Sequence, residues 1–205
     1  MTPTHRPASW IGLLDGTVRF FVAGLAIILG LVLISGVGII LGFPFALQDH
    51  VIDVPLDAEA ARTVPDLLPP GTELYGNTQV VVADPSPVQA ALWLVLHATE
   101  VSLWLAGAVL LSRTVRSARW EGPFTRTVAR RLRALGMLAV LGGLGTAVLN
   151  LGVGSALTAL VLADGAFYTI VDVPLAVVLL GLAVLAISEI VHHGVDLRED
   201  AEATI

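Results

Sequence analysis

The chain has 205 residues, of which 56% are hydrophobic and 14% are charged, and its formal net charge is −6. Soluble domains carry about 25% charged residues, so this chain has too few charges to cover a water-exposed surface. It contains no cysteine, which excludes disulfides, thiolate catalysis and iron–sulfur clusters. The apolar residues lie in four runs, each near the length of about 20 residues that crosses a bilayer. Together these features predict a polytopic membrane protein.

The four runs predict an all-α membrane protein, a four-helix transmembrane bundle, with residues 1–205 forming a single domain. The first run continues past Ser35 without a clean small-x-small cleavage site. We therefore interpret it as a retained span and not as a cleaved signal peptide. The spans are expected at about residues 20–42, 88–111, 135–162 and 174–191.

Residues 43–87, between the first two spans, differ in composition from the rest of the chain. They are acidic and contain seven prolines, which exclude a long helix. Residues 51–56 resemble a strand, and residues 72–75 and 79–83 flank Gly76 and Asn77 in the manner of a β-hairpin. We expect a small, acidic, β-containing cap on the extracytoplasmic side.

Residues 112–134, between the second and third spans, hold seven of the chain's eleven basic residues, all of them arginines. The cap has one arginine, and the turn before the fourth span has none. Because basic residues are enriched in short cytoplasmic loops, we expect this arginine-rich loop and both termini, including the tail at 192–205, to be cytoplasmic. Gly122 and Pro123 are expected to end one helix there, and Thr125 to cap the next.

Small residues recur every four positions in the third span, which predicts tight packing against a neighbouring helix. These positions are Ala139, Gly143 and Ala147, followed by Ser155, Ala159 and Ala163.

Two segments carry a family resemblance. One is G-P-F-T-R-T-V-A-R-R-L-R-A-L-G at 122–136, and the other is G-V-D-L-R-E-D-A-E-A-T-I at 194–205. Together they resemble a bacterial four-span membrane family catalogued as domain of unknown function twenty-nine seventy-five. The resemblance implies no established activity, and a frequent genomic pairing with a small helix-turn-helix regulator.

Four arginines of the loop allow two interpretations. They can fix the topology and pair with anionic lipid headgroups, or they can form a docking surface for a cytoplasmic partner or for the acidic tail. Direct nucleic-acid binding is not expected, because the loop is short and faces anionic lipid. The four are Arg126, Arg130, Arg131 and Arg133, and the acids of the tail are Glu199, Asp200 and Glu202.

The second span is interrupted by His97 and Glu100, which lie three positions apart and share a helix face with Trp93 and Trp104. An ionisable residue in the middle of a membrane is costly and suggests a functional site. The pair could act as a proton relay, a ligand contact or two ligands of a metal.

A metal site usually needs three or four ligands, and the similar Glu189 and His192 are expected at another depth. The alternative is a structural pair, hydrogen-bonded to Asn150 or Ser155, that fixes helix packing.

The sequence thus predicts a non-enzymatic envelope or regulatory protein of the plasma membrane, without a cofactor or a metal. Its expected partners are the lipid bilayer, a small cytoplasmic DNA-binding regulator and, as a further possibility, a second copy of itself. A proton-coupled transporter or permease that uses His97 and Glu100 is one alternative. An intramembrane metalloenzyme is another.

Overall fold

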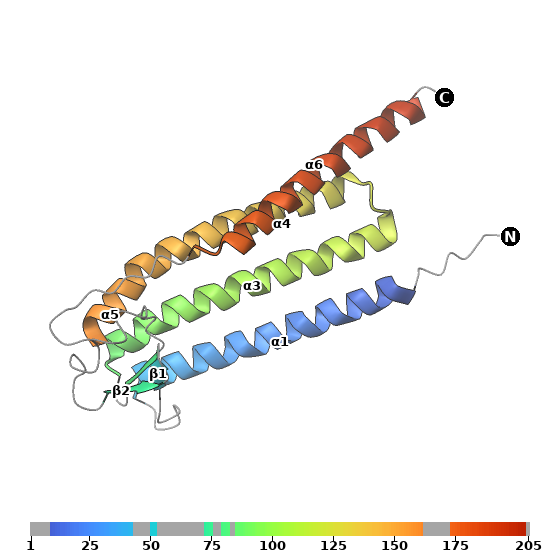
Figure 1. Cartoon of the computed structure of the whole chain (residues 1–205). Coiled ribbons are helices and arrows are strands. Elements are labelled where there is room, and N and C mark those ends of the chain that lie inside the picture. The colour runs from blue at the N-terminus through green and yellow to red at the C-terminus, as the bar shows by residue number, and fades with distance from the viewer. Residues whose placement is uncertain are drawn as a thin grey trace. The chain divides into compact units, whose positions relative to one another are not determined.

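The computed structural model describes residues 9–42, 50–52, 72–75, 79–82, 85–161 and 173–203. Four helical stretches in this part of the chain are long and apolar enough to cross a membrane, and they form the long ribbons of Figure 1. This confirms the all-helical, four-span membrane class. The stretches are Gly12–Ile40, Pro87–Glu121, Arg126–Val161 and Leu175–Ala201.

Three of these stretches are α1 (Ser9–Ile40), α3 (Pro87–Glu121) and α6 (Leu175–Ala203). The third is composite. It starts as α4 (Arg126–Leu149), widens into a π-helix, η2 (Asn150–Gly154), and ends as α5 (Ser155–Val161). The sequence did not predict the π-helix, which is a rare element that often accompanies functional sites.

Most of the expected arginine-rich loop is helical, because α3 runs to Glu121 and α4 begins at Arg126. Arginine is a good helix former, so both helices continue beyond their apolar segments. The predicted break is present: Gly122 has a φ of 92°, a left-handed conformation that favours glycine. The Thr125 hydroxyl accepts a hydrogen bond from the Val128 amide at 3.3 Å, as an N-cap does.

A small antiparallel sheet with the strand order β1-β3-β2 lies between α1 and α3 in the sequence. Its strands are β1 (His50–Ile52), β2 (Thr72–Tyr75) and β3 (Gln79–Val82). β2 and β3 coincide with the two strands of the expected hairpin. The intervening turn, and most of residues 43–87, lie outside the described residues.

The chain divides into two compact units. The first contains Met1–Ile27, Ser102–Leu144 and Pro174–Ile205, and the second contains Ile28–Val101 and Gly145–Val173. In the second unit, α1 and α3 pack closely, because a Cβ on Gly36 would lie only 2.5 Å from Leu94 Cδ1.

The start of α3, in the second unit, is fixed by a reciprocal capping box that the sequence analysis missed. The Ser86 amide donates to Gln89 Oε1 at 2.7 Å, and the Gln89 amide donates to Ser86 Oγ at 3.3 Å. Gln89 Nε2 also donates to the Leu160 carbonyl at 2.9 Å. Because Leu160 lies in the last turn of α5, this bond satisfies a carbonyl that has no partner within its own helix.

In the first unit, α4 and α6 are antiparallel, and the backbone of one helix comes close to the backbone of the other. A Cβ on Gly136 would lie 2.9 Å from the Gly181 carbonyl oxygen, and a Cβ on Gly181 would lie 3.0 Å from that of Gly136. A Cβ on Gly143 would lie 3.6 Å from Pro174 Cγ. Ala139 and Gly143, the first two positions of the predicted row of small residues, therefore pack against α6.

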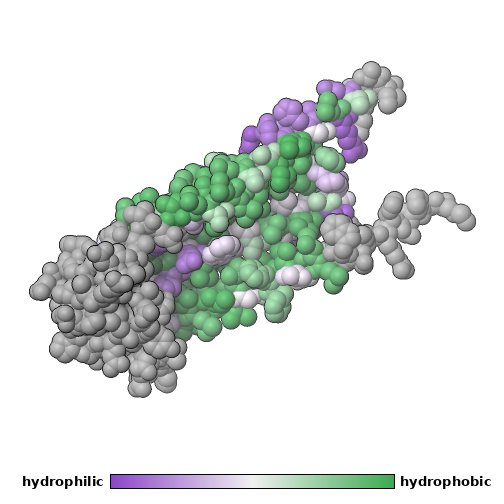
Figure 2. Space-filling view, in the orientation of Figure 1, coloured by the Kyte–Doolittle hydropathy of each residue, from purple (hydrophilic) through white to green (hydrophobic). Residues whose placement is uncertain are grey.

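The four long helices expose most of their large apolar side chains in the isolated chain. Phe20, for example, is 81% exposed, Leu180 is 64% exposed and Ile190 is 69% exposed. Figure 2 shows hydrophobic side chains along the helices and hydrophilic ones gathered towards the C-terminal end of α6. This distribution is expected when lipid, and not water, surrounds the apolar segments.

We expect Gly181→Ala to lower the free energy of unfolding by about 1–3 kcal/mol, because it overpacks a contact between two backbones. The matched control is Gly145→Ala in α4, since nothing lies within 4 Å of a Cβ at that position. The control should leave stability unchanged or raise it by up to about 1 kcal/mol, because alanine is the better helix former. Unfolding of the purified protein in detergent measures both, and equal losses would contradict the close approach.

Candidate functional site

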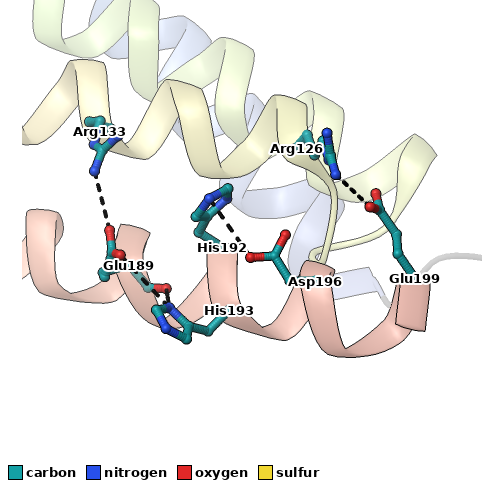
Figure 3. Close-up of polar contacts among 7 residues, drawn as sticks. All are labelled: Arg126, Arg133, Glu189, His192, His193, Asp196 and Glu199. Carbon is teal, nitrogen blue, oxygen red and sulfur yellow. Dashed lines mark hydrogen bonds and ion pairs between the residues drawn. The ribbon is translucent and has the colours of Figure 1, made fainter. Parts of the chain in front are cut away.

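The charged ends of α4 and α6 are joined by side chains from both helices. Arg126 donates a hydrogen bond to Glu199, and Arg133 Nη2 lies 3.2 Å from Glu189 Oε2 (Figure 3). Between these two ion pairs, the buried Ser188 hydroxyl donates to the Ala129 carbonyl at 3.0 Å. We call these three interactions, made by Arg126, Ala129, Arg133, Glu189, Ser188 and Glu199, the α4–α6 contact.

The two segments that carry the family resemblance meet in this region. The Phe124 ring packs against Gly194, where an added Cβ would lie 3.1 Å from Phe124 Cδ1. Arg126 of the first segment meets Glu199 of the second. The residues that make the sequence recognisable therefore include residues that attach α6 to α4.

The four arginines singled out in the sequence have different surroundings. Arg126 and Arg133 pair with acids of α6, and Arg131 Nη1 donates to the Arg113 carbonyl at 2.6 Å. Arg130 is exposed and forms no ion pair within the described part of the chain. The expected contact between the loop and the acidic tail therefore exists at Arg126, while Arg130 keeps its charge accessible.

Two adjacent histidines of α6 lie beside the α4–α6 contact. His192 points towards α4, with its Nε2 3.9 Å from Asp196 Oδ2, whereas His193 points away from α4 (Figure 3). His193 Nδ1 lies 3.2 Å from the Glu189 carbonyl oxygen and 3.8 Å from Glu189 Oε1. Both rings are largely exposed and sit beside acids of their own helix, as expected for solvated residues.

A second charged cluster, which the sequence analysis missed, joins the start of α1 to the end of α3. The Asp15 carboxylate is only 11% exposed and lies 2.7 Å from Arg19 Nη2 and 3.9 Å from Arg119 Nη1. The buried Nε of Arg119 has no acceptor in the described structure, and its guanidinium lies over the Trp120 ring at 5.6 Å. The spacing of four between Asp15 and Arg19 was the available signal, because it places both on one helix face.

His97 is oriented by the residue one helical turn before it. Its ring stacks on Trp93 with centroids 4.4 Å apart and planes inclined by 28°. Its Nδ1 lies 3.0 Å from the Trp93 carbonyl oxygen. The neighbouring Glu100 is exposed, and no hydrogen bond or ion pair joins it to another described residue. The Ser155 hydroxyl, one of the expected partners, donates within its own helix, 2.6 Å from the Leu151 carbonyl.

Among the described residues, no group of three or more histidine, aspartate or glutamate side chains is close enough to hold a metal ion. Within the described structure, no third histidine, aspartate or glutamate lies with His97 and Glu100 to complete a metal site. Glu189 forms an ion pair with Arg133 instead.

Comparison with known proteins identifies a family for this chain. The sequence model of the family described as "Protein of unknown function (DUF2975)" matches residues 58–205 of this chain. No curated protein and no solved structure matches it. The match includes α3, α4, α5 and α6, and therefore all residues of the α4–α6 contact.

We expect Asp15→Ala to lower the free energy of unfolding by about 1–3 kcal/mol, because it removes hydrogen bonds to a charged group and leaves Arg119 partly buried without a carboxylate. Asp196→Ala is the matched control, since that side chain is 48% exposed and surface substitutions usually change stability by less than about 0.5 kcal/mol. Unfolding in detergent measures both variants. Similar losses for the two would show that the Asp15 cluster does not stabilise the fold.

Proposed function

Since the chain belongs to the DUF2975 family and has four helices that can cross a membrane, we propose that it is a non-enzymatic protein of the bacterial plasma membrane that works with a small cytoplasmic helix-turn-helix regulator. The partner binds the exposed surface beside the α4–α6 contact. It recognises both the remaining positive charge of α4 and the charged end of α6.

The observation that carries this proposal is the charged, helical C-terminal part of α6. Its C-terminal turns, from His192 onwards, are charged and still helical to Ala203. The Arg126–Glu199 pair joins these turns to α4. A helix end that is polar on several sides and already helical suits contact with another protein, because little chain entropy is lost when the partner binds.

The distribution of charge supports the proposed orientation. Seven arginines lie between Arg113 and Arg133, so the ends of α3 and α4 that meet at Gly122 belong on the cytoplasmic side. With four spans, both termini are then cytoplasmic. The acidic segment at 43–87, whose three short strands pair as one sheet, forms a small cap outside.

The absence of cysteine makes this topology directly testable. A single cysteine at Ala201, in the exposed last turns of α6, should escape a membrane-impermeant maleimide in intact cells and react after lysis. A cysteine at Thr78, in the cap, should react in intact cells. Labelling of Ala201→Cys before lysis, or of neither position in intact cells, would contradict the proposed orientation.

The partner proposal is tested with a small helix-turn-helix regulator of the kind that the family resemblance implies. We expect Arg130→Glu, and deletion of residues 197–205, to weaken binding of this regulator at least about tenfold, because the reversed or missing charges slow association and place like charges together. Arg130→Lys keeps the charge and should bind within about threefold of the wild type. Binding to the protein in nanodiscs measures all three.

The variant Arg130→Glu is informative because Arg130 forms no ion pair within the described structure, so its loss leaves the α4–α6 contact intact. Equal binding of the regulator by the wild type, Arg130→Glu and the truncated chain would refute the proposal.

A further inference from the structure

Glu100 lies at the middle of a membrane span and on its surface. It is twelve residues after Val88 and eleven before Leu111, about 18 Å and 17 Å along the helix axis at 1.5 Å per residue. Its side chain is exposed in the isolated chain, and within the described structure it has no hydrogen-bond or ion-pair partner. A carboxyl group at this depth is unfavourable against lipid, and no described residue of its own chain satisfies it.

The other ionisable group on this face is His97, which is half-buried and whose Nε2 has no hydrogen bond among the described residues. Nδ1 lies 3.0 Å from the Trp93 carbonyl oxygen, and a carbonyl only accepts, so Nδ1 carries the proton of this hydrogen bond. The stacking on Trp93 limits rotation of the ring. Nε2 therefore remains as the atom that can meet a carboxyl group, either as an acceptor or, in the imidazolium, as a donor.

His97 and Glu100 do not satisfy each other within one copy, because no ion pair within 4.0 Å joins them in the described structure. One helix face thus carries a carboxyl group without a partner and an imidazole nitrogen that could be its partner. Such a face is complementary to itself, which is the requirement for a two-fold symmetric interface.

We propose that α3 forms an interface between two copies of this chain, in which His97 Nε2 of each copy pairs with the Glu100 carboxyl group of the other. A two-fold axis along the membrane normal places the two α3 helices parallel and at equal depth. His97 and Glu100 then differ in level by about 4.5 Å along the axis. Both side chains lean towards the N-terminus of their helix, so the flexible Glu100 side chain spans this difference by extending towards His97 of the other copy.

Each pair holds one proton between two groups and is electrically neutral whichever group carries it. The proton resides either on Glu100, which then donates to Nε2, or on Nε2, which then donates to the carboxylate. A neutral, hydrogen-bonded pair is tolerated within a bilayer, whereas a separate carboxylate is not. This inference does not depend on the proposed regulator, because its residues lie in a span and not in the proposed cytoplasmic surface.

The test is co-purification of two differently tagged copies from mild detergent and from nanodiscs. The wild type should associate. Copies that all carry His97→Ala should associate at least about fivefold more weakly, and so should copies that all carry Glu100→Ala. In either case the dimer loses both His97–Glu100 pairs. Val95→Ala is the matched control: Val95 is also exposed, but it lies about 140° around the helix from Glu100, so this variant should associate like the wild type.

Mixing the two variants gives the decisive result. A His97→Ala copy combined with a Glu100→Ala copy retains one complete pair and leaves no unpaired carboxyl group. The mixed complex should therefore form at least about threefold more readily than either variant forms with itself. A purely structural role of either residue within its own chain predicts no such rescue. Circular dichroism of each variant establishes that its helices are intact.

Three outcomes would overturn the proposal. The wild type could remain monomeric, with Glu100 reacting with a hydrophobic carbodiimide as a protonated, lipid-facing acid. The variants could associate as strongly as the wild type, which would place any interface elsewhere. The mixed variants could show no rescue, which would mean that Glu100 pairs with a different membrane protein and not with a second copy of this chain.

Discussion

The backbone contact between α4 and α6 at Gly136 and Gly181 sets the register of all other interactions between these helices. Seven residues from it in one direction, Gly143 faces Pro174, and seven residues in the other, the Ala129 carbonyl meets Ser188. Seven residues are close to two helical turns, so these positions stay on one face of each helix. Each contact includes a glycine, alanine or serine on at least one helix, which allows the two axes to remain close.

This register also explains where the charged residues of the two helices pair. Arg133 and Glu189 lie just beside the face that carries the small residues. Arg126 follows about two turns further along α4, and Glu199 about three turns further along α6. Their ion pairs are exposed, and exposed pairs contribute little to stability. The small residues bring the helices together, and the charges then determine how the end of α6 lies on α4.

The sequence was sufficient for the features that depend on local chemistry. The apolar runs predicted four helical spans because lipid requires internally satisfied backbones, and Gly122 and Thr125 predicted the break between α3 and α4. Contacts between distant residues were not predictable in this way. Gln89 reads as an ordinary polar residue until the fold places it beside Leu160. The partners of Gly136 and Asp15 likewise depend on how helices far apart in the sequence pack.

The π-helix and the candidate sites illustrate the same limit. The segment from Asn150 to Gly154 contains two glycines, which weaken an α-helix but do not specify a π-helix. The acidic tail could be assigned to the arginine-rich region by charge, and the structure selects Arg126 among four candidates. The spacing of His97 and Glu100 predicted that they share a helix face. It did not predict whether another part of the same chain covers that face.

The carboxylates of the described helices have different partners, and the partner depends on how far the carboxylate is removed from water. Glu189 and Glu199, near the charged end of α6, meet arginines of α4 and remain partly in water. Asp15 is more buried and lies near two arginines, as a carboxylate must when solvent is mostly withdrawn. Glu100 has no arginine partner among the described residues. The same electrostatic requirement that explains Glu189, Glu199 and Asp15 therefore motivates the proposed pairing of Glu100 with His97 of a second copy.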